Sequence, residues 1–212
     1  MLVVAALSLG FPVLQDLSVT PKLAKGQKYV WSLKCDATVG GQQHDTTMDL
    51  TEEVTGDSDS KGFPVHLTLD NLAVDGSQYP GDDAKGVVSA QNVLQSADSD
   101  DRRKMFSALL FVFPSMPLTK GLTWKADFTN PPDSKVSYSY TATDTEKVNN
   151  EDTLKVTGTV KDATTGGLDE SGTWWVNGAG KVVKFKLDTK NWSVTMGGGM
   201  QVDATITGTL KP

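Results

Sequence analysis

Apolar and polar residues alternate at every second position through most of this chain. The clearest case is the carboxyl-terminal segment, where Met200, Val202, Ala204, Ile206 and Leu210 alternate with polar neighbours. Successive side chains of an extended strand point to opposite faces of a sheet. The pattern is therefore typical of an antiparallel strand with one buried face and one solvated face.

The same alternation recurs along the chain. Expected strands lie at 29–37, 48–54, 65–69, 124–128, 136–142, 154–160, 174–176, 182–187 and 192–196, with a weaker one near 87–88. Asn177-Gly178-Ala179-Gly180 is typical of a hairpin turn. Thr, Ser, Asp and Gly are plentiful, which favours strands and turns over helices. The chain is therefore predicted to be mainly β, with about ten strands in an antiparallel meander.

Two stretches of the chain repeat one another. Lys25-Gly26-Gln27-Lys28-Tyr29 is echoed by Lys120-Gly121-Leu122-Thr123-Trp124. Thr51-Glu52-Glu53-Val54 begins 25 residues after Gly26, and Thr145-Glu146-Lys147-Val148 begins 24 residues after Gly121. A repeat at fixed spacing indicates duplication of one structural unit. We therefore predict two repeat halves, at about 25–97 and 120–212, that build one curved sheet, a half-barrel.

One segment departs from the alternation. Residues 102–113 are apolar on most sides, with Asp98-Ser99-Asp100-Asp101 before them and Pro114 after them. Acidic and serine residues are typical of a helix start, and proline is typical of a helix end. The pattern predicts one central helix at about 101–113, buried over most of its circumference and enclosed by the sheet. A buried strand at 109–113 is the alternative for the end of this run.

The chain is long enough, at 212 residues, to bury a sizeable core as one all-β domain. The segment 114–121 between the repeats is too short and too apolar to be a linker. We therefore predict a single β-rich domain at 20–212, preceded by an apolar segment at 1–19.

The apolar segment resembles the hydrophobic part of a secretory signal. Residues 2–14 are mostly apolar, but they have no basic residues before them and no clear cleavage site after them. A signal remnant is the main interpretation, and a first strand or a docking arm is the alternative. The run is about 13 residues long and contains Gly10 and Pro12, so it is too short to span a membrane as a helix. We expect an extracytoplasmic protein (periplasmic, cell-surface or secreted) that is not an integral membrane protein.

The charge and the single cysteine exclude other classes. A net charge of -6 argues against a nucleic-acid partner, whose phosphates attract basic proteins. Cys35 is the only cysteine, so no intrachain disulfide can form. It shares a strand face with Trp31 and Leu33, which is typical of a buried small hydrophobic residue.

Residues with catalytic chemistry are few. His44 lies in a polar turn and is expected to be solvated, and His66 is expected to face water or a cross-strand partner. The chain has no nucleophile elbow and no paired histidines or cysteines at metal-binding spacing. The loop at 57–62 resembles the start of a calcium loop, but Thr68 stands where a glutamate is required. We predict no catalytic residues, no metal, no cofactor and no enzymatic activity.

The segment Phe113-Pro114-Ser115-Met116-Pro117-Leu118-Thr119-Lys120-Gly121-Leu122-Thr123-Trp124 resembles a motif of uncharacterised bacterial exported proteins. In those proteins the motif closes a helix and opens a second set of strands. The overall plan also resembles the LolA and LppX lipoprotein carriers, whose unclosed antiparallel half-barrel wraps around helix. This chain has one evident helix where those carriers have several. The resemblance implies an exported bacterial binding protein.

The aromatic and apolar residues near the helix are the candidate ligand site. Core packing is the main interpretation of the tryptophans, with sugar stacking, a lipid lining or a partner anchor as alternatives. Trp174 and Trp175 are neighbours on one strand and must point to opposite faces. We expect an apolar or lipid-like ligand between sheet and helix, lined by Phe106, Leu109, Leu110, Phe113, Trp124 and Tyr140. The alternative function is a structural or assembly subunit that pairs through its edge strands and its amino-terminal arm.

Overall fold

The computed structural model describes residues 17–130, 134–195 and 199–212, so most of the predicted apolar segment at 1–19 lies outside the described residues. The described strands form one twelve-stranded sheet, which confirms the mainly β prediction and exceeds the expected ten strands. The elements are β1 (Lys28–Val39), β2 (Gln42–Val54), β3 (Phe63–Val74), β4 (Ser77–Gln78), β5 (Asp82–Val88), β6 (Leu94–Ala97), α1 (Asp100–Ser107), β7 (Thr123–Asn130), β8 (Ser134–Val148), β9 (Glu151–Asp162), β10 (Asp169–Asn177), β11 (Val182–Val194) and β12 (Met200–Leu210).

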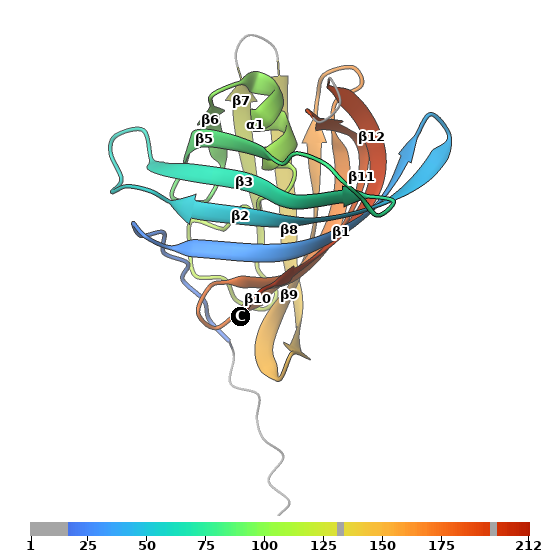
Figure 1. Cartoon of the computed structure of the whole chain (residues 1–212). Helices are drawn as coiled ribbons and strands as arrows, with labels where there is room; N and C mark the ends of the chain where they lie inside the picture. The colour runs from blue at the N-terminus through green and yellow to red at the C-terminus, as the bar shows by residue number, and fades with distance from the viewer. Residues whose placement is uncertain (1–16, 131–133, 196–198) are drawn as a thin grey trace, which may run out of the picture.

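The sheet is one continuous antiparallel path that curls into a nearly closed barrel (Figure 1). Starting at β7, the path follows the chain to β12, passes to β1, and then follows the chain again to β6, with β4 to one side. The passage from β12 to β1 joins strands from opposite ends of the chain, with Trp31 opposite Leu210. The first strand, β1, and the last, β12, therefore lie in the middle of the sheet path, and β6 and β7 are its two ends.

The turns that open β1 and β7 have matching geometry. Gly26 and Gly121 have φ values of 83° and 86°, in the left-handed region that favours glycine. The Gly26 N–H donates to the Val54 carbonyl at 2.8 Å, and the Gly121 N–H donates to the Ala142 carbonyl at 2.7 Å. Ala142 is therefore the counterpart of Val54. The predicted equivalence of Thr145–Val148 was wrong, because β8 runs on past the point where β7 pairs with it.

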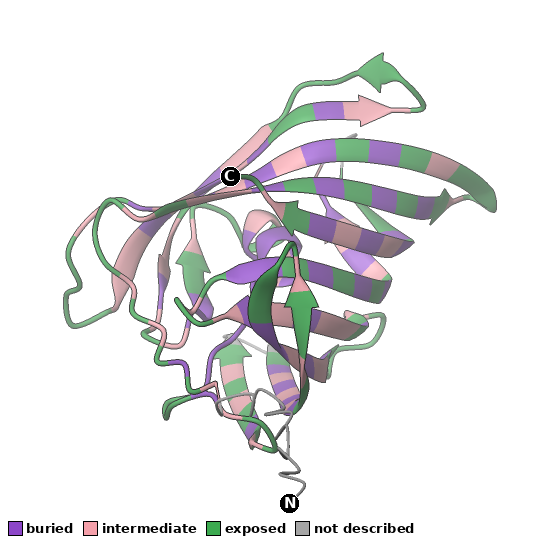
Figure 2. Cartoon of the chain, turned by 90° about the horizontal axis from the view of Figure 1, so that it is seen from below, coloured by how far each residue is buried: buried purple, intermediate pink, exposed green. Residues whose placement is uncertain are grey.

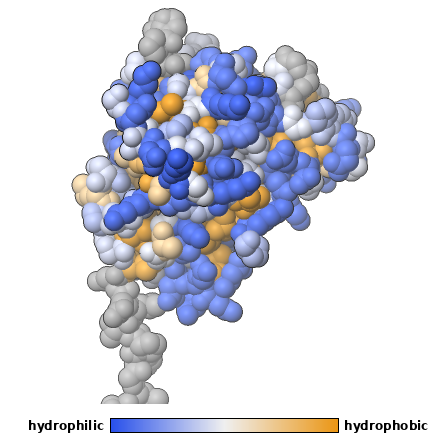
Figure 3. Space-filling view, turned by 60° about the vertical axis from the view of Figure 1, so that its left-hand side comes forward, coloured by the Kyte–Doolittle hydropathy of each residue, from blue (hydrophilic) through white to orange (hydrophobic). Residues whose placement is uncertain are grey.

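The alternation predicted from the sequence places one face of each strand in a common core (Figure 2). In β1, for example, Trp31, Leu33 and Cys35 are buried while the residues between them are exposed. Hydrophobic side chains also reach the surface between hydrophilic ones on the face shown in Figure 3.

The predicted helix begins where the sequence indicates but ends earlier. Ser99 is the N-cap, and its hydroxyl accepts a hydrogen bond from the Arg102 N–H at 3.2 Å. Asp100 and Asp101 follow in the first turn, where negatively charged carboxylates stabilise the helix by interacting with the positive end of its dipole. The helix ends at Ser107, so the prediction of a helix to residue 113 was wrong. The strand alternative was also wrong, because residues 108–114 form a buried segment without regular structure.

Tertiary hydrogen bonds explain the early end of α1. The Trp192 Nε1–H donates to the Met105 carbonyl at 3.0 Å, and the Trp124 Nε1–H donates to the Val112 carbonyl at 3.1 Å. Buried backbone groups need partners, and a helix is only one way to supply them. Here indole groups from β11 and β7 supply them instead. The sequence pattern could not reveal this, because the run is apolar on most sides.

The segment 98–122 carries the chain from β6 to β7, the two ends of the sheet path. Its helix contacts β5, β6 and β11, so α1 lies inside the curve of the sheet. Further along, Leu118 forms an antiparallel bridge with Val19, with N–H···O distances of 2.7 and 2.9 Å. The amino-terminal part of the described chain is thereby tied to this segment.

Candidate ligand-binding sites

A groove of about 560 Å³ opens on the inner side of the sheet, next to α1. Its volume lies in the range of about 300–1,000 Å³ that is common for small-molecule sites. The lining residues come from β1, β2, β3, β5, β11, β12, α1, the segment between β4 and β5, and the residue after β11: Cys35, Ala37, Val39, His44, Thr46, Met48, Leu72, Val74, Tyr79, Pro80, Gly81, Asp82, Arg102, Trp192, Val194, Thr195, Met200 and Val202.

The wall of the groove is mostly apolar because the inward-facing positions of the strands continue beyond the helix. In β1 these positions are Cys35, Ala37 and Val39, and α1 contributes only Arg102 to the lining. Tyr79 and Met200 are 53% and 37% exposed, and they are two of the three large hydrophobic side chains that stand exposed in the described part of the chain. Exposed apolar side chains gathered around a concave surface make the groove a candidate ligand-binding site.

A charged cluster lies at the α1 side of the groove. Arg102 forms ion pairs with Asp82 at 2.9 Å and with Asp98 at 3.3 Å. The Thr195 hydroxyl also donates to the Asp82 carboxylate. An apolar wall with a few polar groups at one side suits an amphipathic molecule better than a fully polar one.

Both histidines are paired with aspartates. His44 lies at the start of β2, not in a loop as predicted, and its Nδ1 is 2.8 Å from Asp75 Oδ2. His66 contacts Asp83 of the neighbouring strand β5 at 3.0 Å, which confirms the predicted cross-strand partner. These hydrogen bonds hold the pKa values of Asp75 and Asp83 below the usual range of a carboxyl.

Cys35 lies at the groove but is buried, as its position on the strand predicts. Burial raises the pKa of its thiol to about 12, and the neighbouring Asp36 charge adds to the effect. Because the thiolate is the reactive form, this cysteine acts as a small hydrophobic residue of the wall.

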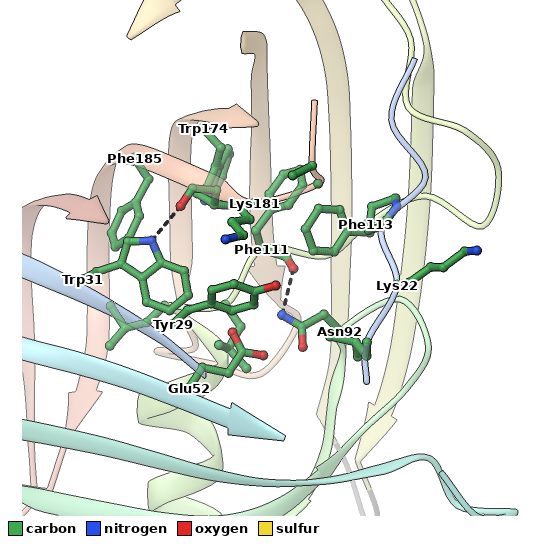
Figure 4. Close-up of a pocket in the computed structure, with 17 residues that line it drawn as sticks. Lys22, Tyr29, Trp31, Glu52, Asn92, Phe111, Phe113, Trp174, Lys181 and Phe185 are labelled. Carbon is green, nitrogen blue, oxygen red and sulfur yellow. Dashed lines mark hydrogen bonds between the residues drawn. The ribbon is translucent and has the colours of Figure 1, made fainter. Parts of the chain in front are cut away.

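A second, much smaller cavity of about 40 Å³ lies further along the inner face of β1 and β2 (Figure 4). Its walls are largely aromatic and apolar, and two lysines and a glutamate are the charged residues among them. The lining comprises Pro21, Lys22, Leu23, Tyr29, Trp31, Glu52, Asn92, Leu109, Leu110, Phe111, Phe113, Trp174, Ala179, Gly180, Lys181, Val182 and Phe185.

Glu52 is the unusual residue of this cavity. It is buried on β2 opposite Tyr29, and burial raises the pKa of its carboxyl to about 7, although a hydrogen bond from Asn92 opposes that effect. Figure 4 shows Glu52, Tyr29 and Asn92 side by side. Glu52 Oε1 and Asn92 Oδ1 receive no hydrogen bond from the described residues. Buried acceptors normally receive hydrogen bonds, so a bound group with N–H or O–H donors could pair with these two.

A second buried carboxyl, Glu170, has a different setting. Burial raises its pKa well above the usual value, but Glu170 lines neither the groove nor the small cavity. It therefore belongs to the core between strands.

The six residues predicted to line a ligand site are all buried in or near the core. Leu109, Leu110 and Phe113 line the small cavity. Phe106, Trp124 and Tyr140 line neither the small cavity nor the groove. Their role in ligand binding stays a prediction.

Phe111 brings several of these side chains together. Its ring lies 4.9 Å from that of Phe113, 6.0 Å from that of Trp124 and 5.2 Å from that of Tyr140. Trp124 and Tyr140 also stack on each other with ring centres 5.2 Å apart. This cluster supports the core-packing interpretation of the aromatic residues.

Trp174 and Trp175 point to opposite faces of β10, as predicted. Trp174 is buried against Phe111, whereas Trp175 is partly exposed and interacts with the Lys184 ammonium group, 4.9 Å from its ring centre.

The sequence reasoning missed the groove residues of β12 and β3, such as Met200, Val202 and Val74. The alternation that predicted the strands also marks these residues as inward-facing. The length of α1 was the missing information, because a helix of the predicted length would have covered more of the inner face.

Among the described residues, no group of three or more histidine, cysteine, aspartate or glutamate side chains is placed to hold a metal ion. Across the same residues, no helix has both the length and the apolar character needed to cross a membrane.

The sequence matches no protein-family model and shows no significant similarity to a curated protein. Among solved structures, the chain is similar to a Bacteroides fragilis protein of YmcC-like fold that is predicted to be exported. The two chains share 11% sequence identity, and the alignment covers 93% of this chain and 100% of the other, with a TM-score of 0.35.

Proposed function

We propose that this chain is a non-enzymatic, exported bacterial protein that binds an apolar or lipid-like ligand in the 560 Å³ groove. The observation that carries the proposal is the continuous apolar wall on the inner face of the sheet, with Tyr79 and Met200 exposed at its border. A wall of this kind is unfavourable in water unless it is covered.

The geometry favours a ligand with an apolar chain and one polar end. The apolar chain of the ligand would lie along the inward-facing residues of β1, β2, β11 and β12. The polar end of the ligand would lie near Arg102 and Asp82. Each buried methylene contributes about 0.8 kcal/mol, and the entropy cost of association is at least about 4 kcal/mol. Affinity should therefore rise steeply with chain length.

Export is supported by the apolar character of residues 2–14, which matches the hydrophobic part of a secretory signal. The assembly alternative has less support. The sheet path does end at β6 and β7, but the predicted amino-terminal arm lies outside the described residues.

The first test is native mass spectrometry of the purified protein, followed by lipid extraction. A co-purified lipid-like molecule of defined mass is expected. The second test is a titration with dansylundecanoic acid, a fluorescent fatty acid, whose emission rises when its dansyl group leaves water.

A matched pair of variants locates the binding site. Ala37 faces the groove, and its neighbour Thr38 is exposed on the opposite face of β1. Ala37→Trp should fill the groove and lower affinity at least tenfold, whereas Thr38→Trp should leave affinity unchanged. A ligand-free protein that does not bind the probe, or equal binding by both variants, contradicts the proposal. Sedimentation of the same samples as a stable oligomer would favour the assembly function.

A further inference from the structure

We propose that the small cavity beside Glu52 is a second site, separate from the groove, that binds the terminal ammonium group of a primary amine. The groove and this cavity share no lining residue among those described. This inference therefore does not depend on the proposed function.

The first observation is the unmet hydrogen-bonding capacity of the cavity. Glu52 Oε1 and Asn92 Oδ1 are both buried acceptors, and neither receives a hydrogen bond from the described protein groups. An alkylammonium group is a donor with three N–H bonds and no acceptor, so it matches two acceptors that lie in one cavity. Its positive charge would also pair with the carboxylate in a setting that screens it little.

The second observation is the aromatic wall. Tyr29, Trp31, Phe111, Trp174 and Phe185 all line the cavity. The faces of aromatic rings attract cations, and they also pack against the first carbon atoms of an alkylamine. An acidic group enclosed by aromatic rings is therefore suited to an organic cation and unsuited to an anion.

One ring of this wall already interacts with a cation of the protein itself. The Lys181 ammonium group lies 5.7 Å from the ring centre of Tyr29. Lys181 and Lys22 are the cationic residues of the lining, and both are exposed, so water screens their charges more than it screens Glu52. Their positive charge makes the affinity for a simple amine modest.

The size of the cavity sets the size of the group. A buried water needs about 10–15 Å³ by this measure, so a cavity of about 40 Å³ has room for about three non-hydrogen atoms. A nitrogen and two carbons of a primary amine fit that number. A tetramethylammonium ion, with five non-hydrogen atoms, is too large.

The experiment is a nuclear magnetic resonance titration of the full chain with ethylammonium chloride, with sodium chloride as the ionic-strength control. The Trp31 indole N–H donates to the Val182 carbonyl at 2.7 Å, and both residues line the cavity, so its resonance is a local reporter. Ethylammonium should shift this resonance saturably at pH 8. Sodium chloride and tetramethylammonium chloride should not.

The matched variants are Glu52→Gln and Glu53→Gln. Glu53 is adjacent on β2 but lies outside the cavity and faces Lys28, 3.6 Å away. Glu52→Gln should lower the affinity for ethylammonium at least tenfold, and Glu53→Gln should leave it unchanged. Dispersed amide resonances of each variant verify that it is folded.

Wild-type protein provides an independent arm. With a Glu52 pKa of about 7, affinity should fall at least tenfold between pH 8 and pH 5.5, because the carboxyl becomes protonated. Tyr29, Lys22 and Lys181 are the other titratable groups of the lining, and burial raises the pKa of the Tyr29 phenol. If ethylammonium causes no saturable shift at pH 8, the cavity holds water only and the proposal is wrong. Equal binding by Glu52→Gln also overturns it.

Discussion

Gly208 in β12 has no side chain because the ring of Phe185 occupies the space where one would lie. A Cβ atom at Gly208 would approach Cε1 and Cζ of Phe185 to 2.3 Å and Leu33 Cδ2 to 2.9 Å. Gly158 in β9 stands in the same relation to Tyr140, 2.2 Å from Cδ1. A glycine inside a strand often marks a close approach of this kind. Both glycines lie two residues from an apolar position of the same strand, but the alternation could not show which ring they accommodate.

Gly208→Ala should therefore destabilise the protein. Forcing an extra methyl group into a packed core typically costs about 1–3 kcal/mol, because the ring must leave its preferred rotamer. Urea unfolding followed by tryptophan fluorescence measures the change. Gly178→Ala is the control, because a Cβ there meets only Leu17, at 3.4 Å, and its stability should change by less than about 0.5 kcal/mol.

Glu52 should make stability depend on pH. Its pKa is about 7 in the folded protein and about 4.5 in the unfolded chain, so the unfolded chain loses its proton first as pH rises. The contribution of Glu52 to the free energy of unfolding is therefore fully present below about pH 4.5. It is lost as the pH rises from there through about 7. The difference of about 2.5 pKa units corresponds to about 3 kcal/mol.

Urea unfolding of wild type and Glu52→Gln at pH 4.5 and pH 8 measures this effect. The variant cannot ionise, so its advantage over wild type should grow by about 3 kcal/mol between the two pH values. Other groups, including the buried Glu170, are common to both proteins and cancel in the difference. An advantage that does not change with pH would contradict the assigned pKa.

At the scale of elements, tryptophan side chains hydrogen-bond to the backbone of other segments and so connect those segments to the sheet. The Trp192 indole on β11 binds α1 through the Met105 carbonyl, and the Trp124 indole on β7 binds the irregular segment through the Val112 carbonyl. The tryptophans were predicted to serve mainly as core packing. Their N–H groups also supply hydrogen bonds to one carbonyl in the last turn of α1 and to one in the segment that follows it.

Trp192→Phe keeps most of the apolar surface and removes the indole donor. The Met105 carbonyl would then be buried without this partner, which costs about 1–3 kcal/mol. Hydrogen exchange should show faster exchange of the α1 amides in addition to the loss of global stability. Trp175→Phe is the control, because its indole binds Glu146 at the exposed surface and a change below about 0.5 kcal/mol is expected.

β11 shows how an element can be misread from its pattern. The sequence predicted two strands, 182–187 and 192–196, because the apolar positions change from odd numbers, such as Phe185 and Leu187, to even ones, such as Trp192 and Val194. The structure has one strand over Val182–Val194 with a register shift between Thr189 and Trp192, where Asn191 has a φ of 55°. A bulge changes which residues face inward without ending the strand.

At the scale of the whole molecule, the pairing of β12 with β1 joins the first and the last strand of the chain. This pair links residues 31 and 210, the largest sequence separation in the sheet, and each of its strands has a second partner on the other side. Long-range pairings close late in folding because a long loop must be ordered first. The folded protein should nevertheless be most stable here, far from the ends of the sheet path.

Hydrogen–deuterium exchange tests whether the strands in the middle of the sheet path are the most stable ones. The amides of β1, β11 and β12 should exchange most slowly, and those of β6, a four-residue strand at one end of the path, should exchange fastest among the strands that form the path. Equal protection of β6 and β12 would contradict it.

Local patterns in the sequence determined the class of the fold, most strand positions and the start of α1 at Ser99. Each of these depends on neighbours within a few residues, so periodicity and capping are sufficient to predict it. The interior of β12, for example, follows from its alternation alone.

Only the tertiary structure decided the end of the helix, the groove and the cavity. These depend on contacts between residues far apart in sequence: indole groups from β7 and β11 meeting carbonyls at 105 and 112, and Glu52 meeting Asn92 across the core. A short helix inside a long curved sheet leaves part of the inner face uncovered. A local sequence pattern cannot predict how much of the sheet the helix covers. That coverage depends on the relative lengths of two elements that pack against each other.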